Sequence, residues 1–450
     1  MKNRINLIQK TKNFINNGHE RSVKTKKNII VLFALKGYSV AINLALIPLT
    51  LLLLDDYKYG VWITLFNMLS WISIFDIGIG NGVRNKFAES MANRNFGDAR
   101  EYVSTGYILL AIISVGLVTL FIFPWIVINW AIVFNVNLAL KNELTYLVGI
   151  VFLLTCIQFA LKLIGTILTA DHKPAMAGLL TAISNTIILI VFFFGKQILN
   201  GNLFLIGALY SLLPVIVIFL TSIILFNGKY KYIKPSIRFY NQKKVKDLFG
   251  LGMRFFVIQI AVLIIFQTDS LIIAHTLSPN EVTSYNIVFR YFGVITMLTG
   301  IILTPLWSAY TDAFALKDYS WIKKIIKKQL FLLIGVVLVV VILFFSANKL
   351  IPIWLQRPIF LNSTLLLGMA IFTIISVWNN IFSFLLNGLS RTKIQIITSI
   401  VGMIINIPIS IYLAKILGNG GVIIGSIISL SFFAILGAYE TYRIFKIEMQ

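Results

Sequence analysis

The stretch IFDIGIGNGVRNKFAESMANRNFGDAREYV, residues 74–103, changes character partway along its length. It begins as the end of an apolar segment that carries one acid, Asp76, and glycines follow at positions 78, 80 and 82. Beyond them the sequence is polar and amphipathic and holds four cations, Arg84, Lys86, Arg94 and Arg100. Because glycine interrupts regular helices, the pattern predicts that a membrane helix ends at these glycines and that a surface helix follows.

The whole chain has the composition of an integral membrane protein. Of its 450 residues 58% are hydrophobic and only 12% are charged, with a mean hydropathy of +0.89, whereas a soluble domain is about 25% charged. The net charge of +23 comes from Lys and Arg in the gaps between apolar segments, so we expect no nucleic-acid partner. Cys156 is the one cysteine and the three histidines are scattered, so we expect no disulfide, metal site or cofactor.

Twelve apolar segments are long enough to cross a bilayer, whose core of about 30 Å requires roughly 20 helical residues. They lie near residues 29–54, 60–80, 105–128, 144–170, 175–195, 203–226, 249–275, 284–308, 329–347, 363–387, 394–415 and 421–443. The predicted fold class is therefore an all-α polytopic membrane protein with about twelve transmembrane helices.

The distribution of Lys and Arg predicts the orientation of these helices. Residues 1–28 hold eight of the cations, and the positive-inside rule places such a segment in the cytoplasm. If alternate gaps lie on the same side, the inner side holds 29 Lys and Arg and the outer side six. We therefore expect a multi-pass protein with cytoplasmic N- and C-termini.

The two halves of the chain resemble one another. A shift of 223 residues aligns the block that begins at Phe75 with ILTPLWSAYTDAFALKDYSWIKK, so that Gly82 falls on Pro305 and Arg100 on Lys323. Duplicated bundles with helix breakers in corresponding places are typical of transporters. We predict a basic N-terminal segment (1–28), a first six-helix bundle (29–226), a basic cytoplasmic linker (227–248) and a second six-helix bundle (249–450).

Motifs of enzymes are missing from the sequence. No stretch reads GxxxxGK[ST], HExxH or GxSxG, so we expect neither ATP hydrolysis nor hydrolytic chemistry by this chain. The pair Asp55-Asp56 lies in a predicted outer loop, where membrane glycosyltransferases place an acid. That loop has about five residues and no large outer domain follows it, so we interpret both acids as solvated loop residues.

Six charged residues lie inside predicted spans and at least four residues from either end, where they are costly unless they pair or line a wet cavity. Depth along the helices, at about 1.5 Å per residue, puts Lys36 beside Asp76 near the inner side and Asp269 beside Arg290 near the outer side. We predict these two ion pairs, either as structural contacts or as part of a transport pathway.

Two further cations, Lys162 and Arg254, have no acid at similar depth in a neighbouring predicted helix. Arg254 can extend to the lipid headgroups, but Lys162 lies deeper. If both face a cavity between the halves, they offer a positive lining for a phosphate-bearing solute. The predicted substrate pathway is therefore Lys36, Lys162, Arg254 and Arg290, with Asp76 and Asp269 as candidates for ion coupling or gating. We interpret the neutral polar residues of the spans mainly as interhelical hydrogen-bonding groups.

The block FDIGIGNGVRNKFAESMANRNFGDAREYVSTGY resembles the segment after the second helix of Wzx-type polysaccharide flippases. FQTDSLIIAHTLSPNEVTSYNIVFRYF, LTPLWSAYTDAF and LNGLSRTKIQ extend this resemblance over most of the chain. It implies the multidrug/oligosaccharidyl-lipid/polysaccharide exporter superfamily, with two six-helix bundles in a V that work by alternating access.

The resemblance also implies a function in the bacterial cytoplasmic membrane. Wzx-type proteins move undecaprenyl-diphosphate-linked oligosaccharides from the inner to the outer leaflet for O-antigen, capsule or exopolysaccharide assembly. The expected partners are this lipid-linked oligosaccharide, membrane lipids, protons or sodium ions, and other polysaccharide-assembly proteins.

Two alternatives remain open at this stage. A cation-coupled multidrug exporter of the same superfamily would need acids to hold cationic drugs, whereas this chain places four cations and two acids in its spans. A membrane glycosyltransferase or polymerase would need acids in sizeable outer loops.

Overall fold

The computed structural model describes residues 20–171, 173–249, 260–261, 263–389 and 391–447, and their regular structure is entirely helical. The main helices of the first half are α2 (Glu20–Leu53), α3 (Asp56–Leu69), α4 (Ile79–Ala92), α5 (Phe96–Val127), α7 (Lys141–Leu161), α8 (Leu163–Ala170), α9 (Pro174–Phe194), α11 (Leu203–Asn227) and α12 (Gln242–Phe249). Those of the second half are α14 (Asp269–Thr276), α15 (Pro279–Ala315), α16 (Tyr319–Leu355), α17 (Ser363–Gly388), α18 (Lys393–Leu417) and α19 (Asn419–Ile447). Short helices α6 (Trp130–Val133) and α10 (Lys196–Leu199) and several 3₁₀ turns connect them.

The predicted spans other than 249–275 coincide with these helices. Within the described residues, nine helices are each long and apolar enough to cross a membrane, and a bent pair adds a tenth. The predicted first span lies in α2, of which the stretch Gly37–Leu53 is apolar. The predicted span 249–275 includes residues 250–259, and these lie outside the described part of the chain. The chain is thus an all-α, multi-pass membrane protein.

The predicted boundary between the apolar segment and the polar helix after it is a sharp bend, which we call the elbow. Residues Asp56–Asp76 and Ile79–Met91 meet at an angle of 48°. The backbone turns at Ile77 and Gly78, whose φ angles of 46° and 83° are left-handed, a conformation that glycine adopts without strain.

Only one of the three predicted glycine breaks is real, because Gly80 and Gly82 lie inside α4. Gly82 instead allows a close approach between helices, since a Cβ atom there would lie 2.4 Å from the carbonyl oxygen of Leu248 in α12. The corresponding break in the second half is also absent. Pro305, which the 223-residue shift places on Gly82, lies within the continuous helix α15.

The internal duplication is visible at the turn after each elbow position. Arg94 and Lys317, which are 223 residues apart, have φ angles of 55° and 56°. The next residues, Asn95 and Asp318, cap α5 and α16 by accepting backbone N–H groups three positions further on. Their own N–H groups donate to carbonyls five residues back, at 2.9 and 2.8 Å. The same turn is therefore built twice, at the spacing that the sequence comparison predicts.

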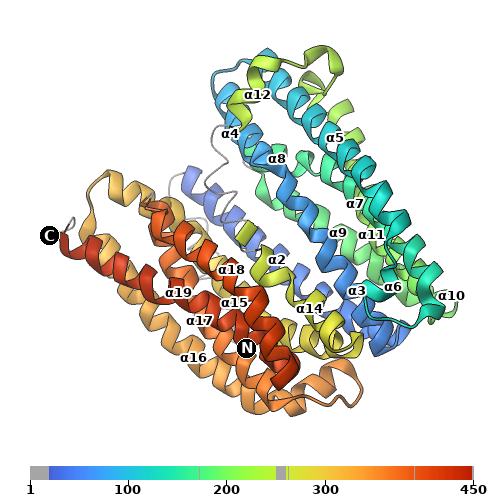
Figure 1. Ribbon diagram of the computed structural model, residues 1–450. Helices are drawn as coiled ribbons and strands as arrows, with labels where there is room; N and C mark the ends of the chain where they lie inside the picture. The colour runs from blue at the N-terminus through green and yellow to red at the C-terminus, as the bar shows by residue number, and fades with distance from the viewer. Residues whose placement is uncertain (1–19, 172, 250–259, 262, 390, 448–450) are drawn as a thin grey trace, which may run out of the picture.

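The helices form two groups arranged as a V (Figure 1). One group contains α5, α7, α9 and α11, and the other contains α15–α19; the two converge near α3 and α14 and separate towards α4 and α12 on one side and the C-terminal helix on the other (Figure 1). α2 packs mainly on α9, whereas α3 packs mainly on α15. α3 therefore carries most of the contact between the groups.

The basic segment predicted as a linker packs on the first group of helices. Its 3₁₀ turns and α12 lie against α4 and α5, and Asn241 donates to Glu101 at 2.7 Å. Tyr230 of this segment is fully buried and donates its hydroxyl to Asp171, 2.6 Å away. Burial, and then this bond, raise the pKa of Tyr230 above its ordinary value, so the phenol stays protonated as a donor at neutral pH.

Candidate functional site

The two groups of helices meet in a pseudo-symmetric contact between the N-termini of α3 and α15. A Cβ atom at Gly60 would lie 1.8 Å from the carbonyl oxygen of Pro279. In the reverse direction, Thr283 donates its hydroxyl to the carbonyl oxygen of Asp56 at 2.5 Å. Gly60 and Thr283 are 223 residues apart, as are Asp56 and Pro279. We call this contact the closed end of the molecule.

The acids of the first predicted outer loop are structural residues of the closed end. Asp55 caps α3 by accepting the backbone N–H of Lys58 at 2.7 Å, and the Asp56 carboxylate forms an ion pair with Arg357 of the other group. We predicted that Asp56 is a solvated loop residue. In the structure its carboxylate takes part in the contact between the groups.

Three cavities adjoin one another at the junction of the two groups. A cavity of about 450 Å³ lies among α3, α7, α9 and α11, and we call it the first-group cavity. Another of about 420 Å³ lies among α15, α17, α18 and α19, and we call it the second-group cavity. A smaller one of about 200 Å³, between α2 and α15, shares Asn43 and Arg290 with the first and Phe289 with the second. The shared lining residues therefore place the three cavities in a row from one group to the other.

Arg290 of α15 is the cation at the centre of this row. It lines the first-group cavity, the connecting cavity and a small recess beside Tyr59 and Tyr210. Its Nε donates to Asn286 at 3.0 Å, and no carboxylate of the described residues lies within ion-pair distance of it. The remaining guanidinium N–H groups are therefore available to an anion in the cavity.

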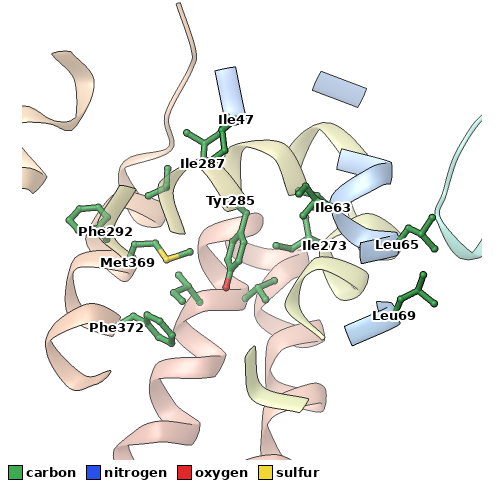
Figure 2. Close-up of a cluster of buried hydrophobic side chains, with 14 of the residues drawn as sticks. Ile47, Ile63, Leu65, Leu69, Ile273, Tyr285, Ile287, Phe292, Met369 and Phe372 are labelled. Atoms are coloured by element: carbon green, nitrogen blue, oxygen red, sulfur yellow. The ribbon is translucent and has the colours of Figure 1, made fainter. Parts of the chain in front are cut away.

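The predicted pair between Asp269 and Arg290 is wrong. Asp269, at the start of α14 and 3% exposed, accepts hydrogen bonds from the hydroxyls of Tyr285 and Ser426. Figure 2 shows Tyr285 extending into the middle of the buried cluster, with its hydroxyl directed away from Ile287. The prediction used only depth along the helices, which does not tell which neighbours a side chain meets: Arg290 instead donates to Asn286.

Asp76 and Lys162 form an ion pair of 3.0 Å between two interrupted helices. Asp76 lies at the elbow and also accepts the backbone N–H of Gly80 at 2.7 Å, which caps α4. Lys162 lies at the break between α7 and α8, with its ammonium 4.4 Å from the centre of the Phe159 ring. The pair thus joins two helix breaks at the same level of the first group.

This contact corrects the prediction that Lys162 has no acidic partner. The depth comparison considered only helices adjacent in sequence, whereas α4 and α8 pack together in space. Asp76 therefore pairs with Lys162. The side chain of Lys36, its predicted partner, and the whole of Arg254 lie outside the described part of the chain.

We expect the Asp76–Lys162 pair to contribute modestly to stability, because both side chains are partly exposed. In a double-mutant cycle of Asp76→Ala and Lys162→Ala, thermal melting in detergent should give a coupling energy of about 0.5–1 kcal/mol. Asp76→Asn should cost less than Asp76→Ala, since an amide oxygen still caps Gly80. Simple additivity of the two alanine substitutions would exclude a stabilising pair.

Several neutral polar residues of the spans make the predicted interhelical hydrogen bonds. Asn185 donates to Asn43 at 3.2 Å, and Asn379 donates to the carbonyl of Leu430 at 3.1 Å. Asn380 is different: it lines the second-group cavity without a hydrogen-bond partner in the described part of the chain. Sequence reasoning also missed Tyr285, although a tyrosine one span away from an intramembrane acid is a plausible donor to it.

Comparison with known proteins gives three consistent likenesses. Residues 255–412 match the model of the MatE family. The chain is 26% identical over 419 residues to a protein of Salmonella typhimurium named as an O-antigen transporter, covering 90% of this chain and 93% of the relative. It is 22% identical over 373 residues to one of Yersinia pseudotuberculosis named as an O-antigen export protein, covering 79% and 81%.

Solved structures show the same fold. An inward-facing multidrug resistance MATE transporter of the MOP superfamily superposes with a TM-score of 0.70 at 18% identity, covering 92% of this chain and 98% of its own. An outward-facing structure gives a TM-score of 0.62 at 16% identity, covering 93% and 95%. The family match and the two relatives agree with the resemblance to Wzx-type polysaccharide flippases and with a membrane transporter, and the solved structures confirm the helical fold.

Proposed function

We propose that this protein moves an undecaprenyl-diphosphate-linked oligosaccharide from the inner to the outer leaflet of the bacterial cytoplasmic membrane. The single observation that carries the proposal is Arg290, a cation without an acidic partner in the described part of the chain, which lines the first-group cavity, the connecting cavity and the small recess beside Tyr59. A sugar chain and a diphosphate cannot cross about 30 Å of hydrocarbon unaided. The O-antigen names of the relatives agree with this cargo.

The distribution of contacts supports alternating access. The closed end joins the groups through Gly60, Thr283 and Arg357, while the opposite ends of the groups diverge (Figure 1). If the basic loops are cytoplasmic, as the positive-inside rule predicts, the structure corresponds to an inward-open state. The polyprenyl tail would stay in the lipid at the gap between the groups, and the diphosphate would meet Arg290. Lys162 and Arg254 remain candidates for the entry path.

Ion coupling, in this proposal, involves Asp269. A carboxylate that is 3% exposed and has only hydroxyl partners in the described part of the chain is costly to bury unless a proton or cation accompanies it. We expect Asp269→Asn to abolish the acceleration of flipping by a proton or sodium gradient in proteoliposomes, while slow flipping without a gradient persists. Retention of gradient-driven flipping in this variant would exclude coupling through Asp269.

Deletion of the gene, followed by analysis of lipid-linked saccharides in each leaflet, tests the function itself. The proposal requires that complete oligosaccharide units accumulate on the inner leaflet and that expression of this chain restores their export. Normal export in the deletion strain would contradict it.

A multidrug exporter remains the second candidate, because the MatE match and the fold are shared with drug transporters. Cationic drugs require acids in the cavity, and the described residues that line the two large cavities include no Asp or Glu. Increased sensitivity to cationic dyes in the deletion strain, with normal polysaccharide export, would favour drug export.

A further inference from the structure

Recognition of a diphosphate by Arg290 does not explain the lining of the second-group cavity. It is lined by polar side chains of α17 and α18 on one part of its wall and by aromatic side chains on another, and its described lining contains no charged residue. Its volume of about 420 Å³ is much larger than a single ion or water requires.

The polar part of the wall is a stripe along α17. Ser376, Asn379, Asn380 and Ser383 are spaced i, i+3, i+4 and i+7, so they lie on one face of the helix. α17 is also the most buried of the candidate spans within the described residues. Four polar side chains on one face of such a helix are costly unless a ligand or the protein satisfies them.

Only some of the polar atoms in this stripe have hydrogen-bond partners in the described part of the chain. Asn379 donates its amide nitrogen to the carbonyl of Leu430, which fixes the orientation of the amide, but its Oδ1 atom is buried without a partner. The buried Ser376 Oγ and Gln395 Oε1 also lack partners, and Asn380 makes no hydrogen bond within the described part of the chain. In the first-group cavity, by contrast, the amides of Asn43 and Asn185 already bond to each other. Buried polar atoms without a partner therefore line the second-group cavity, whereas none of those found in the described residues lines the first-group cavity.

The aromatic part of the wall is a cluster around Phe372. Its ring centre lies 5.6 Å from that of Phe266 and 6.0 Å from that of Phe289. Amide and hydroxyl groups beside aromatic rings suit a ligand with hydroxyls at its edges and apolar C–H faces, which is the chemistry of a saccharide. An acyl chain would leave the polar stripe unsatisfied, and a cationic drug would find no carboxylate there.

The cavity also adjoins the proposed anion site. Phe289, Gly293, Thr296 and Met297 of α15 line both the second-group cavity and the connecting cavity that contains Arg290. Resting on the proposed function, we infer that the second-group cavity is a saccharide-binding subsite, in which α17 contacts the sugar next to the diphosphate held by Arg290. The subsite would contribute to cargo selection through hydrogen bonds from Asn380 and Ser383.

The inference is tested with the purified full-length protein in nanodiscs and two probes. One probe is undecaprenyl diphosphate, and the other is the lipid-linked saccharide pool extracted from the deletion strain; native mass spectrometry reports the affinity for each. We expect wild-type protein to bind the saccharide-bearing lipid at least about tenfold more tightly than the bare lipid. Asn380→Leu combined with Ser383→Ala should remove this difference and leave binding of the bare lipid unchanged.

Two further variants show whether a loss of binding comes from the subsite or from misfolding. Thr373→Val is the matched control, because Thr373 lines the same cavity but its hydroxyl already bonds to the carbonyl of Met369 at 2.7 Å; it should behave as wild type. Gln395→Leu, on α18, should reproduce the selective loss.

The outcomes separate the two proposals. If the Asn380/Ser383 and Gln395 variants keep the tenfold preference, or if wild-type protein binds both probes equally, the saccharide subsite is overturned while diphosphate recognition stands. If wild-type protein binds neither probe, the proposed function fails and the subsite fails with it.

Discussion

Arg290→Gln is expected to weaken the binding of undecaprenyl diphosphate by about 10- to 150-fold. The substitution removes a guanidinium that has no carboxylate partner in the described part of the chain, and charge-assisted hydrogen bonds contribute about 1.5–3 kcal/mol each. Arg290→Lys should lose less, because it keeps the charge but not the bidentate geometry. Binding of the bare lipid by the purified protein, together with leaflet analysis in cells, measures both effects.

A control for this prediction removes a positive charge elsewhere. Lys324 is exposed on α16 and lines none of the described cavities, so Lys324→Ala should leave the affinity unchanged. The melting temperature of Arg290→Gln should stay close to that of the wild type, since the bond to Asn286 can be replaced by the new amide. Wild-type affinity in a well-folded Arg290→Gln protein would show that the anion binds elsewhere.

Gly60→Ala is expected to destabilise the closed end by about 1–3 kcal/mol and to shift the conformational equilibrium about 5- to 150-fold away from the structure described. An alanine Cβ atom would lie 1.8 Å from the carbonyl oxygen of Pro279, and backbone atoms of another helix cannot yield without moving that helix. Because the contact joins the two groups rather than one group internally, separation of α3 from α15 relieves the overlap.

Spin labels at Leu138 and Asn280 would report this separation. Both positions are exposed, on segments that are joined by a hydrogen bond from Asn135 to the carbonyl of Leu277. The distance distribution should move to longer values in Gly60→Ala, and transport should fall because closure no longer completes the cycle. Gly116→Ala, where the added atom meets nothing within 4 Å, is the control. An unchanged distribution in Gly60→Ala would mean that this contact does not hold the groups together.

Several features could be predicted because local composition determines them. Apolar stretches of about 20 residues must form helices in a bilayer, so the spans followed from the sequence. The duplicated turn was also accessible, because Asn95 and Asp318 are both side chains that cap helices, at positions 223 residues apart. The glycines predicted the break at Gly78, although glycine content alone could not tell a break from a close helix contact such as that of Gly82.

Partners of the intramembrane charges could not be predicted in the same way. Depth along a helix gives one coordinate of a side chain, whereas pairing also depends on the face of the helix and on which distant helices pack together. Asp76 therefore meets Lys162, and Asp269 meets Tyr285 and Ser426.

The sequence by itself determined an all-helical membrane protein with an internal repeat, because helix length, capping and charge distribution are properties of neighbouring residues. Only the tertiary structure decided that Arg290 lines both the first-group cavity and the connecting cavity, that Gly60 lies in the contact that closes one end of the molecule, and that the polar face of α17 lines a cavity. Each of these depends on helices that are distant in the chain and come together only through packing, which the order of residues does not reveal.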